Sequence, residues 1–238
     1  YDADGIGATA IMWEALDDLG VKVWPFIPHR EEHGYGLSIK GIEAMILERR
    51  PGLVVTVDNG IVATGAADKL KQEKIDLIIT DHHQVGKKLP EAVAIIHTTA
   101  LCGAGVAWMV VKEINPKAAK TSLDVAALGT VADMMELKGA NRSLVKHGLV
   151  SWRQTDRVGL LELYQEAGVD SATIDTTTIN FVIAPRLNAT GRVSHGLDAL
   201  RLLCTRDKNR AGELAQTLGR ANQDRQLLLQ EQLDHARL

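Results

Sequence analysis

Hydrophobic residues recur along the chain in two different patterns. In the first part, four short apolar runs at 21–26, 53–58, 77–81 and 92–97 are typical of strands that are buried on both faces of a parallel sheet. Segments at about 6–19, 38–49 and 61–73 carry apolar residues at helical spacing and lie between these runs. Alternating strands and helices indicate βαβ units. We therefore expect an α/β fold with a doubly wound, mostly parallel sheet.

The strand pattern ends near residue 100, and the rest of the chain is predicted to be helical. Helices are expected at 103–114, 122–137, 140–150 and 156–167. Leu, Gln, Arg and Glu dominate 206–238, which predicts one long helix, with a break near Gly219 as an alternative. We expect one domain over 1–205, with an α/β part at about 1–100 and a helical part at about 101–205. The helix at 206–238 would then be a linker towards a second domain.

Both ends of the chain interrupt a structural pattern. Residues 1–5 resemble a strand-to-helix turn, and residue 238 lies inside a helical pattern. We interpret the chain as a fragment of a longer protein. The connection at 97–102 is unusually short, and we expect that a loop has been shortened or omitted there.

Composition narrows the class of protein. The 238 residues are 45% hydrophobic and 24% charged, which is ordinary for a globular protein and excludes a disordered chain. No apolar run approaches the roughly 18 residues of a membrane-spanning helix, and no signal peptide is visible. Two cysteines, Cys102 and Cys204, do not make a disulfide framework, so a cytoplasmic location is expected. The net charge of −3 disfavours electrostatic binding of nucleic acid by the whole surface but is compatible with a local basic groove.

Acidic and histidine side chains stand at four places where a strand is expected to pass into a loop. Because the carboxyl ends of parallel strands meet at one edge of a sheet, the first three of these places, at 2–4, 58 and 81–83, should converge. Each motif alone has a plainer explanation, since Asp-x-Asp is usually a turn or a helix N-cap and Asp-Asn-Gly a tight turn. Their combination favours a site. The candidates are Asp2, Asp4, Asp58, Asp81, His82, His83 and Asp133.

Carboxylates combined with imidazole suit Mn²⁺ or Mg²⁺ better than a soft metal. Crowded carboxylates repel one another, and a pair of divalent cations would balance their charge. Two cations about 3.5–4 Å apart share a bridging carboxylate and suit in-line attack on phosphorus. The sequence therefore predicts a two-metal phosphoester site, with ordinary turns and caps as the other interpretation.

In this order, the motifs at 2–5, 57–60, 80–83 and 129–133 resemble the four motifs of the DHH phosphoesterase superfamily. Further segments resemble the RecJ family of bacterial exonucleases specific for single strands. These segments are Arg30 with 34–37, then 103–107, and finally 185–192. The resemblance covers nearly the whole chain and implies a core that removes nucleotides from the 5′ end of single-stranded DNA with Mn²⁺ or Mg²⁺. It also implies a role in recombination and repair, with repair or replication proteins as partners.

The resemblance implies a role for each motif residue. The two ions would be held by Asp2, Asp4, Asp58, His82 and Asp133, with Asp58 as the bridge. Asp81 and His83 would contact the scissile phosphate or orient the ligands. The DNA strand would be bound by Arg30, Arg186, Asn188 and Arg192.

One departure and two alternatives remain. The first motif of the superfamily usually begins one acid earlier, two residues before Asp2, and that position is not part of this sequence. Other members of the superfamily hydrolyse pyrophosphate, short oligonucleotides or cyclic dinucleotides. A related replication module has lost the catalytic residues altogether, but here the visible acids and the histidine pair are intact.

Overall fold

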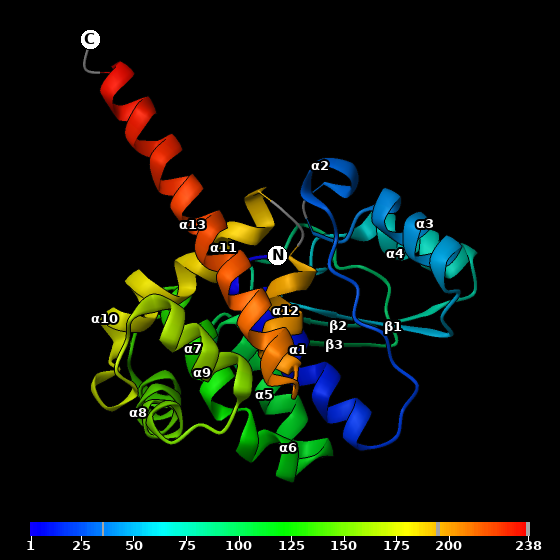
Figure 1. Ribbon diagram of the computed structural model, residues 1–238. Coiled ribbons are helices and arrows are strands. Elements are labelled where there is room, and N and C mark those ends of the chain that lie inside the picture. The colour runs from blue at the N-terminus through cyan, green and yellow to red at the C-terminus, as the bar shows by residue number, and fades with distance from the viewer. Residues whose placement is uncertain (35, 194–195, 237–238) are drawn as a thin grey trace.

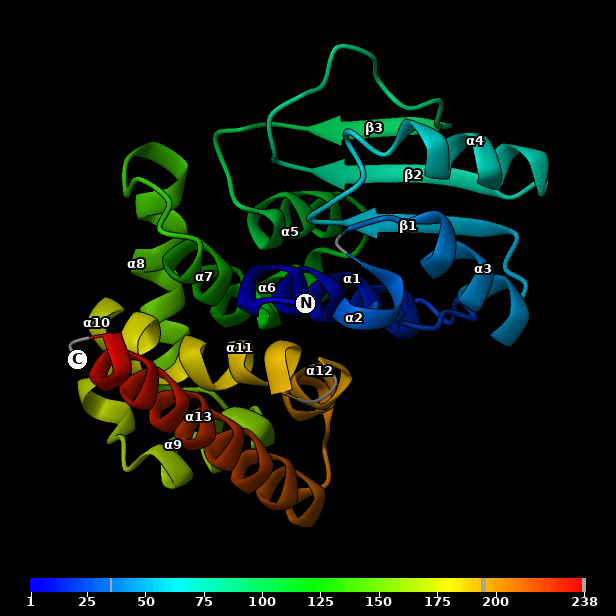
Figure 2. The ribbon, with the colours of Figure 1, turned by 90° about the horizontal axis from the view of Figure 1, so that it is seen from above.

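A three-stranded parallel sheet lies in the first half of the chain, in a computed structural model that describes residues 1–34, 36–193 and 196–236 (Figure 1). The strands are β1 (Leu53–Val57), β2 (Asp76–Asp81) and β3 (Ala94–His97), in the order β1-β2-β3. The register places Asp81 opposite His97. Figure 2 shows that all three strands point towards the same edge of the sheet. The predicted parallel sheet is thus confirmed for three of the four apolar runs.

Helices cover both faces of the sheet, as a doubly wound fold requires. On one face, α3 (Ile39–Glu48) and α4 (Thr64–Gln72) bury Ile42 and Leu70 against Leu77 and Ile79 of β2. On the other face, α1 (Ala3–Asp18) and α5 (Gly103–Ile114) belong to the larger core, against which β1 packs. The central strand β2 is mostly buried, which explains its apolar run, whereas most residues of the edge strands β1 and β3 are only half-buried.

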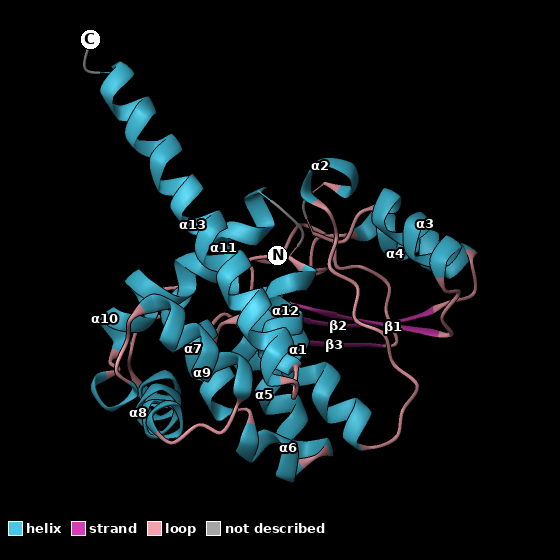
Figure 3. Ribbon diagram, in the orientation of Figure 1, coloured by secondary structure: helices cyan, strands magenta, loops and turns pink. Residues whose placement is uncertain are grey.

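The second half of the chain is helical (Figure 3). Its first helices are α6 (Pro116–Thr121), α7 (Leu123–Ala132), α8 (Gly139–Arg153) and α9 (Val158–Ala167). The short helix α2 (Arg30–His33) belongs to the first half. A 3₁₀ turn (Ser171–Thr173), α10 (Thr176–Thr178) and a π-helix (Ile179–Ile183) follow α9 and lead to α11 (Ala184–Val193), α12 (Leu197–Cys204) and α13 (Lys208–Ala236). Helix α1 packs between the sheet and this helical part, and its buried N-terminal half is rich in alanine and glycine.

The strand predicted at 21–26 is wrong. These residues are extended but belong to no strand, and a cavity of about 610 Å³ lies between them and β1. Pro25 has no N–H to donate to a sheet. The apolar pattern therefore reflects side chains that line the cavity, among them Trp24 and Phe26.

The long C-terminal helix is confirmed, and it runs without a break through Gly219. Its first half packs into the helical part, where Leu214 and Leu218 are buried. Its second half projects from the body of the molecule, and Leu227 and Leu233 are exposed (Figure 1). The domain boundary near residue 205 stays a prediction. None of the helices described in 1–34, 36–193 and 196–236 combines the length and apolar character that a bilayer crossing requires.

Gly219 permits a close approach between α13 and α9. A Cβ atom at this position would overlap the carboxylate of Glu166, which accepts a hydrogen bond from Arg186 Nε at 2.6 Å. We expect Gly219→Ala to lower the free energy of unfolding by about 1–3 kcal/mol, as overpacking usually does. Urea unfolding measures this change.

Gly212→Ala in the same helix is the matched control. Its Cβ would lie 3.6 Å from Glu162 Oε2, an ordinary contact, so helix propensity should dominate and stabilise the protein by up to about 1 kcal/mol. Equal effects of the two substitutions would show that the contact with Glu166 does not control this packing.

Candidate metal centre

The ends of two strands and of two helices meet at one edge of the sheet. Asp58 follows β1 directly, and His82 follows β2. Asp4 lies in the first turn of α1, while Asp133 is the C-cap of α7. The predicted helix at 122–137 thus ends early, at Ala132, and this places Asp133 at the edge. The convergence predicted from the parallel strands is observed for Asp58 and His82, and Asp4 and Asp133 reach the same edge from helices.

The buried carboxylate of Asp4 caps a second helix. Its Oδ2 accepts a hydrogen bond from Gly103 N at 2.7 Å, and its Oδ1 accepts one from Ala104 N at 2.8 Å. These two N–H groups belong to the first residues of α5 and have no partner within the helix. The carboxylate of Asp4 therefore satisfies them at the positive end of the helix dipole. A residue of α1 is therefore bound rigidly to the N-terminus of α5.

Two glycines make room for the carboxylates. A Cβ atom on Gly103 would overlap the side chain of Asp58, and a Cβ atom on Gly129 would overlap Oδ1 of Asp4. Both glycines lie inside motifs quoted above, but the sequence did not reveal that each one faces an acid. Their role is steric, because any larger side chain would displace a candidate ligand.

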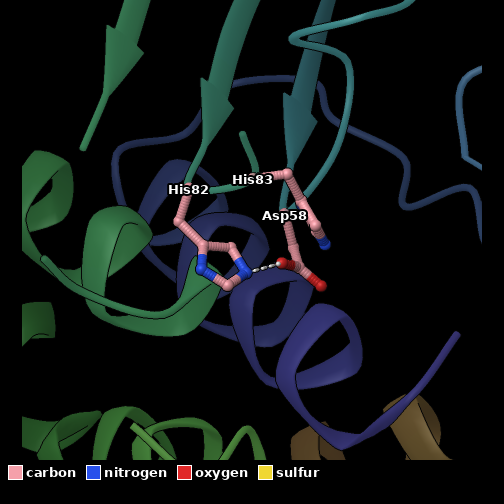
Figure 4. Close-up of side chains that lie close together, drawn as sticks. All are labelled: Asp58, His82 and His83. Atoms are coloured by element: carbon pink, nitrogen blue, oxygen red, sulfur yellow. Dashed lines mark ion pairs between the residues drawn. The ribbon is translucent and has the colours of Figure 1, made fainter. Parts of the chain in front are cut away.

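The ring of His82 lies between the acids. Figure 4 shows it directed at Asp58, with Nε2 3.1 Å from Oδ1. The same Nε2 lies 3.8 Å from Oδ2 of Asp4, and Nδ1 lies 3.8 Å from Oδ2 of Asp133. Potential ligand atoms come within 4.8 Å of one another in two groups, Asp58–His82–His83 and Asp4–His82–Asp133. Two adjoining three-ligand groups of carboxylates and imidazoles match the donor set that Mn²⁺ or Mg²⁺ prefers.

The electrostatics of the cluster show that it lacks positive charge. Burial, together with the nearby Asp58, raises the pKa of Asp4 to about 8. Burial also raises the pKa of Asp58 and of Asp133. Burial alone would lower the pKa of His82, but the hydrogen bond and charge of Asp58, with the charges of Asp4 and Asp133, outweigh it and raise this pKa to about 9. Without cations the cluster therefore retains protons, which divalent cations would replace.

Asp81 organises the turn after β2 and does not face the other acids. Its Oδ2 accepts from Ile61 N at 2.8 Å, and its Oδ1 accepts from His82 N at 2.7 Å. Nδ1 of His83 lies 2.8 Å from the same Oδ1. Burial tends to raise the pKa of Asp81, but these hydrogen bonds together lower it, so the group is a carboxylate. This geometry holds the ring of His83 and the backbone of His82, while the role of Asp81 towards substrate or ligands stays a prediction.

A residue that the sequence did not single out holds the same turn from its other side. Nε2 of His97, at the end of β3, lies 2.7 Å from the carbonyl oxygen of His83. The side chain of His83 is nearly half-exposed, and one of its ring nitrogens lies within 4.8 Å of ligand atoms of Asp58 and His82. His97 can be identified only from the sheet register, in which it pairs with Asp81.

A polar pocket of about 320 Å³ adjoins the cluster. It is lined by Asp2, Asp4 and Asp133, and by Arg30 and Asn188 from the predicted DNA-binding set. Asp2 caps α1 by accepting a hydrogen bond from Gly5 N at 3.0 Å, and it belongs to neither three-ligand group. The guanidinium of Arg30 lies over the ring of Tyr1, 5.7 Å from its centroid.

The remaining predicted DNA-binding residues have other surroundings. Asn188 accepts a hydrogen bond from Ala3 N at 2.6 Å, so its oxygen supports the first turn of α1. The structure does not bring Arg186 to the pocket: Glu166 holds its Nε at 2.6 Å and Val182 O holds its Nη1 at 2.8 Å. The motif identified the arginine but gave no sign of its acidic partner on α9. The side chain of Arg192 lies outside the described residues.

Comparisons with known proteins agree with this geometry. Residues 1–130 match the DHH family, N-terminal domain. The single-stranded-DNA-specific exonuclease RecJ of Bacillus subtilis is 37% identical over 245 residues, which cover 99% of this chain and 31% of that protein. A crystal structure of exonuclease RecJ bound to manganese superposes with a TM-score of 0.90 at 36% identity, over 99% of this chain and 62% of that one.

A second solved structure, RecJ of Thermus thermophilus in complex with Mn²⁺, superposes with a TM-score of 0.84 at 33% identity. The superposition covers 99% of this chain and 36% of the Thermus chain. The chain thus spans about a third of the Bacillus and Thermus proteins that it resembles.

Asp58→Asn tests the electrostatic strain of the cluster. The fold raises the pKa of Asp58, so ionised Asp58 destabilises the metal-free protein as pH rises above the ordinary carboxyl range. We expect the neutral amide to raise the free energy of unfolding by about 1 kcal/mol at pH 8 in EDTA, a usual size for one substitution. Asparagine also suits the backbone φ of 59° at this position.

The exposed Asp68→Asn on α4 is the control, and urea unfolding at pH 8 is the measurement. Asp68→Asn should have no effect. A loss of stability in Asp58→Asn without metal would show that the cluster is not strained by repulsion.

Proposed function

Because this chain belongs to the DHH family, we propose that it is the core of a metal-dependent exonuclease that removes nucleotides from the 5′ end of single-stranded DNA. The observation that carries the proposal is the pair of three-ligand groups that meet at His82 beside a polar pocket. The similarity to RecJ exonucleases supports the choice of substrate. Because the chain spans only part of these relatives, the activity of the whole protein, its role in recombination and repair, and its cytoplasmic location are proposals as well.

The metal ligands proposed for this chain are the five predicted residues. Four of them, Asp4, Asp58, His82 and Asp133, form the cluster, and Asp2 reaches the pocket beside it. When bound there, two Mn²⁺ or Mg²⁺ ions would lower the pKa of a water and stabilise charge on the phosphoryl oxygens. Asp58 stays the proposed bridge between them.

The chain's own residues would bind and orient the DNA. Arg30 borders the pocket and offers a planar guanidinium that suits phosphate oxygens. His83 is oriented by Asp81 through Nδ1, and as an imidazolium it would donate a hydrogen bond from Nε2 to a phosphate oxygen. With only 4% aromatic residues, the chain would hold DNA mainly through phosphates, so binding should depend on salt and not on base sequence.

A nuclease assay with the 238-residue chain tests this function. The substrate is a 3′-labelled single-stranded oligonucleotide, with the same sequence as a blunt duplex for comparison. With Mn²⁺ we expect progressive shortening of the single strand from its 5′ end, and no shortening in EDTA. Asp133→Asn should reduce the rate by about a hundredfold or more, since a metal ligand is lost, whereas Asp68→Asn should leave it unchanged.

Two other outcomes would contradict the assignment. Phosphate release from pyrophosphate without digestion of DNA would indicate one of the small-substrate phosphoesterases. No turnover of either substrate under any metal would indicate a non-catalytic module.

Mn²⁺ binding should release protons. Asp4 and His82, with pKa values of about 8 and about 9, are largely protonated at pH 7 in the free protein, and a cation displaces those protons. Affinity should therefore rise between pH 6 and pH 8. Isothermal titration calorimetry at pH 7 in two buffers of different ionisation enthalpy measures the protons released. Equal heats in both buffers would mean that the ligands are already deprotonated.

A further inference from the structure

Arg157 is a largely buried arginine that contacts Glu14 near the C-terminal end of α1, whereas the polar pocket lies at the N-terminal end of that helix. It is the residue that precedes α9, and only 11% of its side chain is exposed. Its guanidinium forms a two-pronged ion pair with Glu14 of α1, from Nη1 to Oε1 at 2.7 Å and from Nη2 to Oε2 at 3.0 Å. This geometry uses the planar fork of arginine, which lysine cannot reproduce.

The same guanidinium contacts two further helices. Nη1 donates to the carbonyl oxygen of Leu203 in the last turn of α12, at 2.6 Å. Nε lies 3.5 Å from Oδ2 of Asp124 on α7. A Cβ atom on Gly159 would overlap the carbonyl of Leu202, so this glycine lets the start of α9 sit directly against α12. One side chain therefore hydrogen-bonds to α1 and α12 and adds a longer ion-pair contact, without a hydrogen bond, to α7.

Helices α1 and α7 carry acids of the candidate metal centre at their opposite ends. Asp4 faces Gly129, and Gly7 faces Val125 at 3.2 Å, so the two helices run antiparallel. Glu14 follows Asp4 by ten residues, which places it about 15 Å further along α1. The buried residues of α1 between these points are Gly5, Ile6, Gly7, Ala8, Ala10, Ile11 and Met12. The two-pronged ion pair of Arg157 with Glu14 adds a directional contact to this apolar packing.

We propose that Arg157 is a positioning residue that fixes α1 against α7 and thereby sets the spacing of Asp4 and Asp133. The link to activity rests on the proposed function, but the geometric part does not.

Arg157→Lys is the test variant, because it keeps the charge near buried Asp124 and loses the fork. Arg153→Lys is the matched control. Arg153 also binds a carbonyl, that of Ile174, through Nε at 3.2 Å and Nη2 at 2.9 Å, but its bonds reach neither α1 nor α7. Circular dichroism and urea unfolding establish that both variants are folded at the temperature of the measurements.

Two readouts then decide. The first is Mn²⁺ affinity by calorimetry, which we expect to fall about tenfold or more in Arg157→Lys and to stay unchanged in Arg153→Lys. The second needs no metal: hydrogen exchange of the amides of Gly103 and Ala104, which bond to Asp4, should become faster in Arg157→Lys only.

Unchanged amide exchange in folded Arg157→Lys would overturn the proposal, and so would an unchanged Mn²⁺ affinity. A lower stability with both readouts unchanged would give Arg157 a purely structural role. If the unaltered protein binds no Mn²⁺, the proposed function fails, and the amide exchange alone still decides whether Arg157 positions Asp4.

Discussion

The hydrogen bonds from the N-terminus of α5 to the carboxylate of Asp4 are the interaction on which the site depends. They join the first helix of the chain to the helix that follows the sheet, across 99 and 100 positions of sequence. Burying a carboxylate is costly unless it is bonded. Two N–H donors and the positive end of a helix reduce that cost, but the raised pKa of Asp4 shows that they do not remove it. The remaining cost is the electrostatic reason for a cation at this place.

The rest of the architecture holds the acids together against their repulsion. Parallel strands deliver Asp58 and His82 to the same edge, because each ends where its neighbour ends. Gly103 and Gly129 remove the steric barrier at the points of closest approach. At the far ends of α1 and α7, Arg157 opposes any relative movement of the two helices. A rigid scaffold of this kind is what a preorganised metal site requires, since its ligands must not relax apart when no cation is bound.

The arrangement also explains how one DHH-type core can serve a particular substrate. In the proposed function the acids and His82 would supply the phosphoester chemistry, while the pocket beside them is bordered by Arg30 and by Asn188. Substrate selection would therefore lie in the pocket wall and not in the cluster. Arg186, which the motif placed in that wall, instead anchors α11 to α9 through Glu166, beneath the close contact with Gly219.

The sequence by itself determined the parallel sheet, most helices and the acids that meet at its edge, because these follow from local periodicity and from one topological rule. It failed for residues 21–26, whose apolar pattern describes a cavity wall, since a strand needs a hydrogen-bonded neighbour that no local pattern reveals. Only the tertiary structure decided that Asp4 caps α5, that Glu166 engages Arg186 and that Arg157 joins three helices. These contacts link residues 20 to 143 positions apart, and they exist only once packing has excluded water from them.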